Sequence, residues 1–105
     1  MIGLDTGLMI ARDIQPNVRK LGYHVALGGG VLNKGMSEKD LDLYFLPLVG
    51  EAANHSGLVA YLYKAWGVAD TIGCSGGDTN MGVYRDKLRF QTGHGRIEAF
   101  IVREP

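Results

Sequence analysis

The sequence predicts an α+β fold, in which helices pack on one side of a small mixed β-sheet. Two amphipathic helical patterns, at 4–21 and 54–66, alternate with short apolar segments that have the length of strands. The 16 glycines gather around 28–30, 73–82 and 93–95, where they mark loops between the elements. The predicted order is helix, strand, strand, helix, strand, strand, which is typical of the α+β class.

The composition is that of an ordinary globular protein, and we expect residues 1–105 to form a single domain. The 11 basic and 11 acidic residues balance, which argues against avid non-specific binding to nucleic acid. The single cysteine, Cys74, cannot form an intrachain disulfide, so we expect a reducing, cytoplasmic location. No apolar run approaches the roughly 20 residues of a membrane helix, so we expect no membrane association.

The first predicted element is a helix that begins at Leu4 and ends at Leu21, because its apolar residues recur every three or four positions. Asp5 is the candidate N-cap and Gly22 the candidate C-terminal stop. Pro16 lies inside this pattern, and we expect it to kink the helix or divide it.

Two strands are predicted next, over 23–27 and 41–46, because both segments are short, apolar and bounded by turn residues. Glycines end the first strand, and Pro47 closes the second. We expect a loop or a short turn of helix at 31–39.

The second predicted helix covers 54–66, with Asn54 or Ser56 as its N-cap and Gly67 as its end. We expect residues 73–82 to form a loop, because Gly, Ser, Asp and Asn dominate there.

The last predicted element is a hairpin. Residues 84–91 and 96–103 read as its two arms, and 93–95 as its turn.

The candidate functional residues begin with two aspartates, Asp40 and Asp42, at the start of the second predicted strand. Residues two apart on a strand point to the same face, so both carboxylates project together. Carboxylate oxygens are ligands that Mg²⁺ prefers. Upstream, the glycines Gly28 to Gly30 allow a phosphate to approach the backbone closely. Metal, phosphate and carboxylates at one place indicate phosphoryl or nucleotidyl transfer.

Two common glycine-rich phosphate motifs do not fit this chain. A P-loop needs Lys directly after its last Gly, but Met36 follows Gly35. A dinucleotide-binding fingerprint needs a third Gly, and Asn33 stands at that position.

A third pattern does fit. The segment Leu27-Gly28-Gly29, ten residues, and then Asp40-Leu41-Asp42-Leu43 resembles the signature of the DNA polymerase β-like nucleotidyltransferases. The small size and the preceding helix resemble the minimal members of that superfamily, which include the antitoxin partners of HEPN toxins. The glycine segment with Lys39-Asp40-Leu41-Asp42 is also similar to short nucleotidyltransferase-like proteins of phages and prophages.

The resemblance implies a nucleotidyltransferase-like fold and a metal-dependent enzyme. Such an enzyme transfers a nucleoside monophosphate from an NTP to a hydroxyl of a protein, a nucleic acid or a small molecule. The family places a third acidic residue on a later strand that faces the first two. Glu98 is the best candidate here, and Asp86 is the reserve. Asp40, Asp42 and Glu98 would then bind Mg²⁺, and Glu98 would assist the attacking hydroxyl.

The resemblance assigns nucleotide binding to Gly28, Gly29 and Gly30, while Lys34 and Lys39 are candidates to hold the triphosphate. The chain departs from the family at Gly29, where the family often has Ser.

A second hypothesis follows from that departure, namely a catalytically degenerate module of the same fold that binds a nucleotide or a partner protein. Under either hypothesis the chain can act as a homo-oligomer or with a partner subunit. The same residues also allow purely structural interpretations. Gly28 to Gly30 can form a tight turn, and Glu98 can be a strand carboxylate paired with Arg96 or Arg85.

Overall fold

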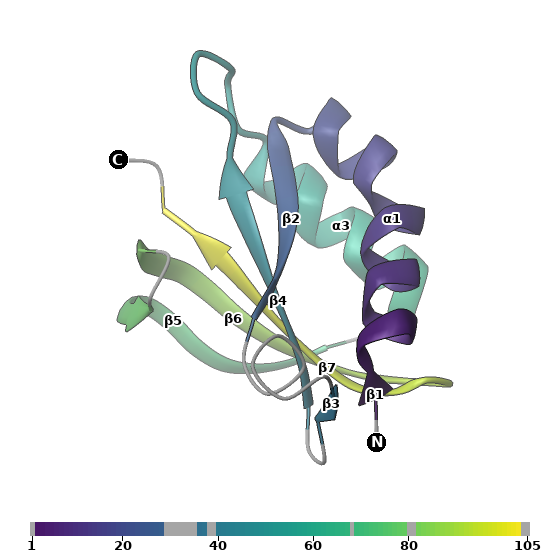
Figure 1. Cartoon of the computed structure of the whole chain (residues 1–105). Helices are drawn as coiled ribbons and strands as arrows, with labels where there is room; N and C mark the ends of the chain where they lie inside the picture. Colours follow the sequence, from purple (N-terminus) through teal and green to yellow (C-terminus); the bar gives the residue numbers. More distant parts are fainter. Residues whose placement is uncertain (1, 29–35, 38–39, 68, 80–81, 104–105) are drawn as a thin grey trace.

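The computed structural model describes residues 2–28, 36–37, 40–67, 69–79 and 82–103. Figure 1 shows the elements in their order along the chain, which are β1 (Ile2–Gly3), α1 (Leu4–Lys20), β2 (Tyr23–Gly28), β3 (Met36–Ser37), β4 (Asp40–Pro47), α3 (His55–Trp66), β5 (Asp70–Thr79), β6 (Gly82–Thr92) and β7 (Gly95–Val102).

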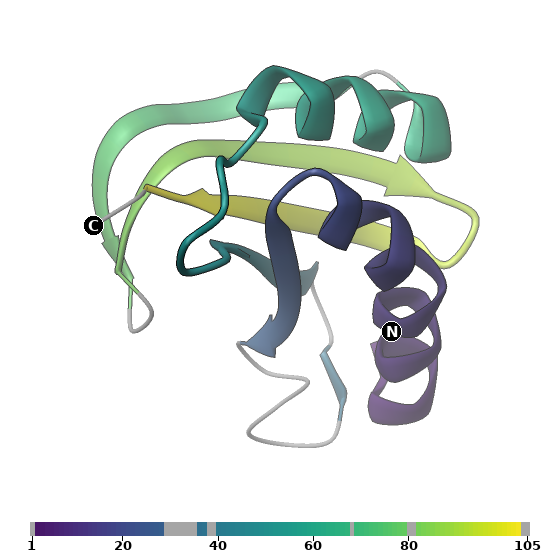
Figure 2. The same cartoon turned by 90° about the horizontal axis from the view of Figure 1, so that it is seen from above.

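Five strands form the main sheet in the spatial order β2-β4-β7-β6-β5, while β1 and β3 form a separate antiparallel pair. The β4–β7 pair is parallel and the other three pairs are antiparallel, so the sheet is mixed. Both helices lie on the same side of this sheet (Figure 2). These features confirm the predicted α+β fold with helices on one side of a small mixed sheet.

The hydrophobic core lies between the sheet and the two helices. Alternate residues of β4, namely Leu41, Leu43 and Phe45, are completely buried, and they pack with apolar residues of α1 and α3. Because strand side chains alternate between the two faces, the residues between them point to the side without helices. The core therefore fixes which face of β4 carries Asp42 and Tyr44.

The helix α1 differs from its prediction at its start and at Pro16. Its N-cap is Gly3, which offers no side-chain hydrogen bond, so the prediction of Asp5 as the cap is wrong. Asp5 lies in the first turn instead, where a negative charge interacts favourably with the helix dipole. Pro16 lies inside a helix that continues to Lys20 and is not divided. Gly22, with a φ of 85°, follows the end of the helix as predicted.

The helix α3 follows its prediction closely. The Asn54 side chain accepts a hydrogen bond of 3.0 Å from the backbone N–H of Gly57, which confirms Asn54 as the N-cap. Gly67 is the C-cap, as predicted. In the described ranges, no helix is long and apolar enough to cross a bilayer.

The prediction of a loop at 73–82 is wrong, because Asp70–Thr79 forms the edge strand β5 against β6. This pairing is irregular, with register shifts between Thr71 and Gly73 and between Cys74 and Gly77. Glycine-rich segments have weak intrinsic strand preference, so backbone pairing with β6 decides the conformation here.

The predicted hairpin at the end of the chain is confirmed as β6 and β7. In the region predicted as a loop or helical turn, Met36 and Ser37 form β3, and the neighbouring residues 31–35 and 38–39 lie outside the described residues.

Candidate functional site

The sheet face without helices, here called the open face, carries two rows of side chains that run across the strands. The charged row joins Gly28, Asp42, Glu98 and Arg89, which are successive register partners on β2, β4, β7 and β6. The aromatic row joins Ala26, Tyr44, Phe100 and Lys87 in the same way.

Asp42 and Glu98 are direct register partners on the parallel strands β4 and β7. Neighbouring strands lie about 4.8 Å apart, so the two side chains leave the sheet next to each other on the open face. The structure thus brings together two of the three predicted carboxylates. The backbone of Asp40 is the register partner of Arg96 at the start of β4, and its side chain is not among the described ones.

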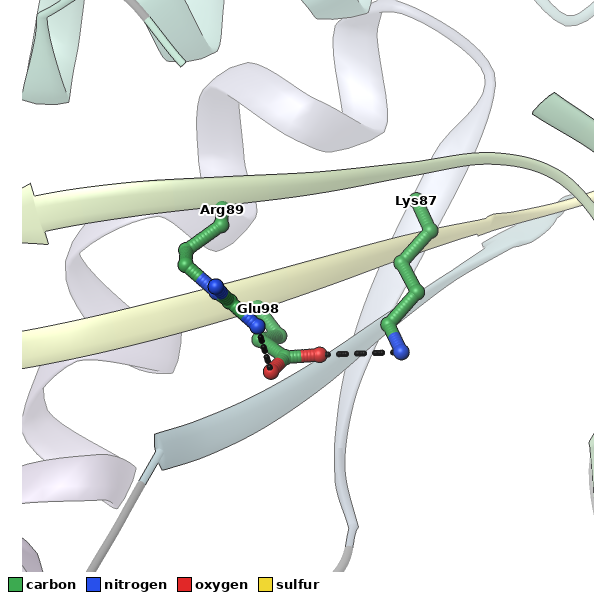
Figure 3. Close-up of polar contacts among 3 residues, drawn as sticks. All are labelled: Lys87, Arg89 and Glu98. Carbon is green, nitrogen blue, oxygen red and sulfur yellow. Dashed lines mark hydrogen bonds and ion pairs between the residues drawn. The ribbon is translucent and has the colours of Figure 1, made fainter. Parts of the chain in front are cut away.

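The carboxylate of Glu98 is held by two cations from β6 (Figure 3). Its Oε1 lies 3.3 Å from Nη2 of Arg89, and its Oε2 lies 3.2 Å from Nζ of Lys87. Glu98 is only 7% exposed, and these contacts compensate for burying its charge. The structure therefore pairs Glu98 with Lys87 and Arg89, whereas the sequence had suggested Arg96 or Arg85.

The surroundings of Lys87 and Arg89 differ beyond their contacts with Glu98. Nζ of Lys87 lies 5.0 Å from the centre of the Phe100 ring, within the range of a cation–π interaction. Nε of Arg89 is buried and has no hydrogen-bond partner among the described residues. Both side chains are partly exposed, at 28% for Lys87 and 32% for Arg89, so they border solvent on the open face.

Asp86, the reserve candidate for the third carboxylate, lies on the helix side of the sheet and not on the open face. Its carboxylate pairs with Nε2 of His55, the first residue of α3. Asp86 therefore faces the helices, whereas its neighbour Lys87 reaches Glu98 on the open face. This arrangement separates Asp86 from Asp42 by the thickness of the sheet.

Gly28 ends β2 directly beneath the ring of Tyr44. A Cβ added at Gly28 would collide with Cε2 and Cδ2 of this ring, so the missing side chain is what allows Tyr44 to lie there. Of the other predicted nucleotide-binding residues, Gly29, Gly30, Lys34 and Lys39 lie outside the described residues.

Tyr44 connects the two rows of the open face. Its ring stacks on Phe100 with the centroids 4.9 Å apart and 13° between the planes, and Tyr84 meets Phe100 edge-on at 5.8 Å. Burial raises the pKa of the Tyr44 hydroxyl above its ordinary value of 10.0, and the negative charges of Asp42 and Glu98 raise it further. The hydroxyl therefore lies within electrostatic range of both carboxylates.

Sequence reasoning missed Lys87, Arg89 and Tyr44 as members of this face. The hairpin contained a usable signal for the first two, because Thr92 pairs with Gly95 and antiparallel pairing then proceeds one residue at a time on each strand. Counting back from the turn pairs Arg89 with Glu98. For Tyr44 the signal was its position two residues after Asp42 on one strand.

The donor set can be tested for its fit to Mg²⁺. Among the described side chains there is no group of three or more His, Cys, Asp or Glu that could hold a metal. Asp42 and Glu98 nevertheless supply hard oxygen donors from neighbouring strands, and Mg²⁺ commonly uses one or two carboxylates together with substrate phosphates and water. The two residues therefore supply oxygen donors of the kind that Mg²⁺ uses, and Glu98 is already ion-paired.

Comparisons with known proteins returned no matching family model, no matching curated protein and no matching solved structure.

Proposed function

We propose that this chain transfers a nucleoside monophosphate from an NTP to a hydroxyl group, with Mg²⁺ bound by Asp42, Glu98 and Asp40. The observation that carries this proposal is the register of three neighbouring strands. It aligns Gly28, Asp42 and Glu98 side by side on the open face. The resemblance of the glycine and aspartate motifs to nucleotidyltransferases supports the same reading.

In the proposed reaction, the acceptor oxygen forms a bond to the α-phosphorus of the NTP, and the bond from that phosphorus to the pyrophosphate oxygen breaks. Mg²⁺, when bound, would polarise the phosphate and stabilise the leaving pyrophosphate. Asp42 and Asp40 would hold the metal ion against the triphosphate, and Glu98 would assist the attacking hydroxyl. The backbone from Gly28 to Gly30 would lie against the phosphates.

A specific observation favours a second function, namely binding of a nucleotide or a partner protein without catalysis. Both oxygens of Glu98 are engaged by Lys87 and Arg89, instead of facing a metal ion or an attacking hydroxyl. For either function we propose a cytoplasmic location, which the single cysteine supports. The acceptor, or a second copy or subunit, would supply the contacts that this small domain lacks.

Incubation with NTPs labelled at the α-phosphate, in the presence of Mg²⁺, tests the proposal. Candidate acceptors are the protein itself, single-stranded nucleic acid and small polyols. We expect label transfer and pyrophosphate release from the wild type, and Asp42→Asn should lower both rates by a factor of about 100 or more, as expected when an electrostatic contact to the transition state is lost.

Asp13→Asn on the exposed side of α1 is the matched control, since it makes the same chemical change away from the sheet. It should leave the rate unchanged. Equal background rates in the wild type and Asp42→Asn would reject the enzyme. Nucleotide binding that persists in both, without turnover, would favour the binding module.

A further inference from the structure

The two cations that hold Glu98 create a conflict within the proposed site. A magnesium ion that uses Glu98 must replace Lys87 and Arg89 at the carboxylate oxygens. Removing only one side of a buried ion pair leaves an uncompensated charge, which is strongly unfavourable. Mg²⁺ alone would leave two partly solvated cations without their carboxylate, and a triphosphate alone would leave the buried Glu98 without a partner.

A magnesium nucleotide resolves the conflict because it brings both signs of charge together. Its metal can replace the two cations at Glu98, while its phosphates replace the carboxylate at the two cations. In such an exchange the metal ion brings positive charge to Asp42 and Glu98, and the phosphates bring negative charge to Lys87 and Arg89. No buried charge is left without a partner at the end of it.

We propose that Lys87 and Arg89 bind the triphosphate of the nucleotide, and that they thereby release Glu98 to the magnesium ion. This inference rests on the proposed function and assigns the triphosphate contacts of that same site. It also explains how Glu98 can be ion-paired in the free protein and still serve the nucleotide-bound protein.

The geometry of the two cations suits this role. Lys87 and Arg89 are two residues apart on β6, so they project from one face roughly 6–7 Å apart and can contact different phosphates of one chain. Arg89 carries a planar fork of donors that matches phosphate oxygens, and one of these donors, Nη2, already contacts a carboxylate oxygen of Glu98. Both side chains are partly exposed on the open face, where a ligand can reach them.

Equilibrium binding by calorimetry tests the exchange without requiring turnover. The probes are MgCl₂ alone, an α,β-methylene nucleoside triphosphate in EDTA, and the two together, with each of the four common bases. For the wild type we expect weak binding of each probe alone. The analogue should bind about tenfold more tightly or better when Mg²⁺ is present, a typical coupling between two linked ligands.

The variants should shift the two affinities in opposite directions. The pair Lys87→Gln and Arg89→Gln removes the phosphate contacts and frees Glu98, so the analogue should bind about tenfold more weakly or worse while Mg²⁺ alone binds more tightly. Glu98→Gln should do the reverse, because it frees the cations and removes a metal ligand. A variant that merely damages the fold lowers both affinities together.

Two control variants show whether a change in affinity is specific to the charges around Glu98. Arg12→Gln and Lys64→Gln remove exposed charges from α1 and α3 and should change neither affinity. If the double variant unfolds, the single variant Lys87→Gln, which keeps Arg89 on Glu98, replaces it. We expect the same directions of change, namely weaker binding of the analogue and tighter binding of Mg²⁺ alone. Affinities that stay within twofold of the wild type in the Lys87, Arg89 and Glu98 variants would overturn the exchange alone. A wild type that binds no analogue with Mg²⁺ would overturn the proposed function as well.

Discussion

Gly28 and Tyr44 share one small volume on the open face, and this contact gives Gly28 a structural role that its sequence motif does not reveal. The motif associates the glycine with phosphate binding, whereas the structure places an aromatic ring over it. The two roles are compatible, because a ring fixed at the end of β2 also borders the place where a nucleotide would lie. The contact can be tested separately from function.

We predict that Gly28→Ala lowers the free energy of unfolding by about 1–3 kcal/mol, because the added methyl group forces the Tyr44 ring off Phe100. Denaturant unfolding measures the change. Gly93→Ala is the matched control, since nothing lies within 4 Å of a Cβ there, and it should change stability by less than about 0.5 kcal/mol. Equal effects at the two positions would show that the ring does not occupy this space.

The ionisation of Tyr44 reports on the charges beside it. Its pKa is raised by burial and by the charges of Asp42 and Glu98, so the unfolded chain, with a value near 10.0, loses this proton first as the pH rises. Below a pH of 10.0, the ordinary value for this group, the folded and unfolded chains both keep the Tyr44 proton, so Tyr44 adds no pH dependence to the stability. Above it, stability decreases as the pH rises further.

We predict that Asp42→Asn lowers the pKa of Tyr44 toward its ordinary value, because one of the two nearby negative charges is removed. Absorbance titration of the phenols measures this, and Tyr44→Phe identifies which transition belongs to Tyr44. Asp13→Asn should leave the transition in place. An unchanged Tyr44 transition in Asp42→Asn would place the two side chains out of electrostatic range.

The helix α1 contains a proline that does not end it. Pro16 cannot donate the backbone hydrogen bond of a helix interior, yet α1 continues through it to Lys20. Ile14 and Val18 on either side of it are buried in the core. Packing of this apolar stripe against the sheet therefore overrides the local preference of the proline.

We predict that Pro16→Ala stabilises the protein by about 1–3 kcal/mol, because the exposed helix interior gains a donor and a residue of high helix propensity. The gain is reduced by the greater freedom of the unfolded chain. Thermal and denaturant unfolding measure it. Asp13→Ala, exposed one turn earlier, should change stability by less than about 0.5 kcal/mol. A loss of stability in Pro16→Ala would show that the proline is accommodated without cost.

Local signals in the sequence predicted most elements but not all of them. Asn54 and Gly67 were predictable, because a cap depends on the residue and its immediate neighbours. The strand β5 was not, because glycine-rich segments carry little strand signal and its pairing partner lies in β6. Asp5 failed as a cap because the helix begins one residue before it, a shift that local preference does not resolve.

The whole sheet decides the site more than any local motif does. The parallel pairing of β4 with β7 brings Asp42 beside Glu98, although α3, β5 and β6 lie between them in the chain. The sequence indicated Asp42 through its spacing from Asp40, and Glu98 through the resemblance to nucleotidyltransferases, but the register comes from the sheet topology. Lys87 and Arg89 then follow from the β6–β7 hairpin, whose turn sets their pairing across the sheet.

Anomalous scattering from Mn²⁺, in crystals grown with an α,β-methylene nucleoside triphosphate, tests most directly whether Asp42 and Glu98 form a metal–nucleotide site. Mn²⁺ takes the same oxygen ligands as Mg²⁺. We predict an anomalous peak between the two carboxylates, with the triphosphate in contact with Lys87 and Arg89. A nucleotide bound away from the open face, or a Mn²⁺ ion that touches neither Asp42 nor Glu98, would contradict the proposed site.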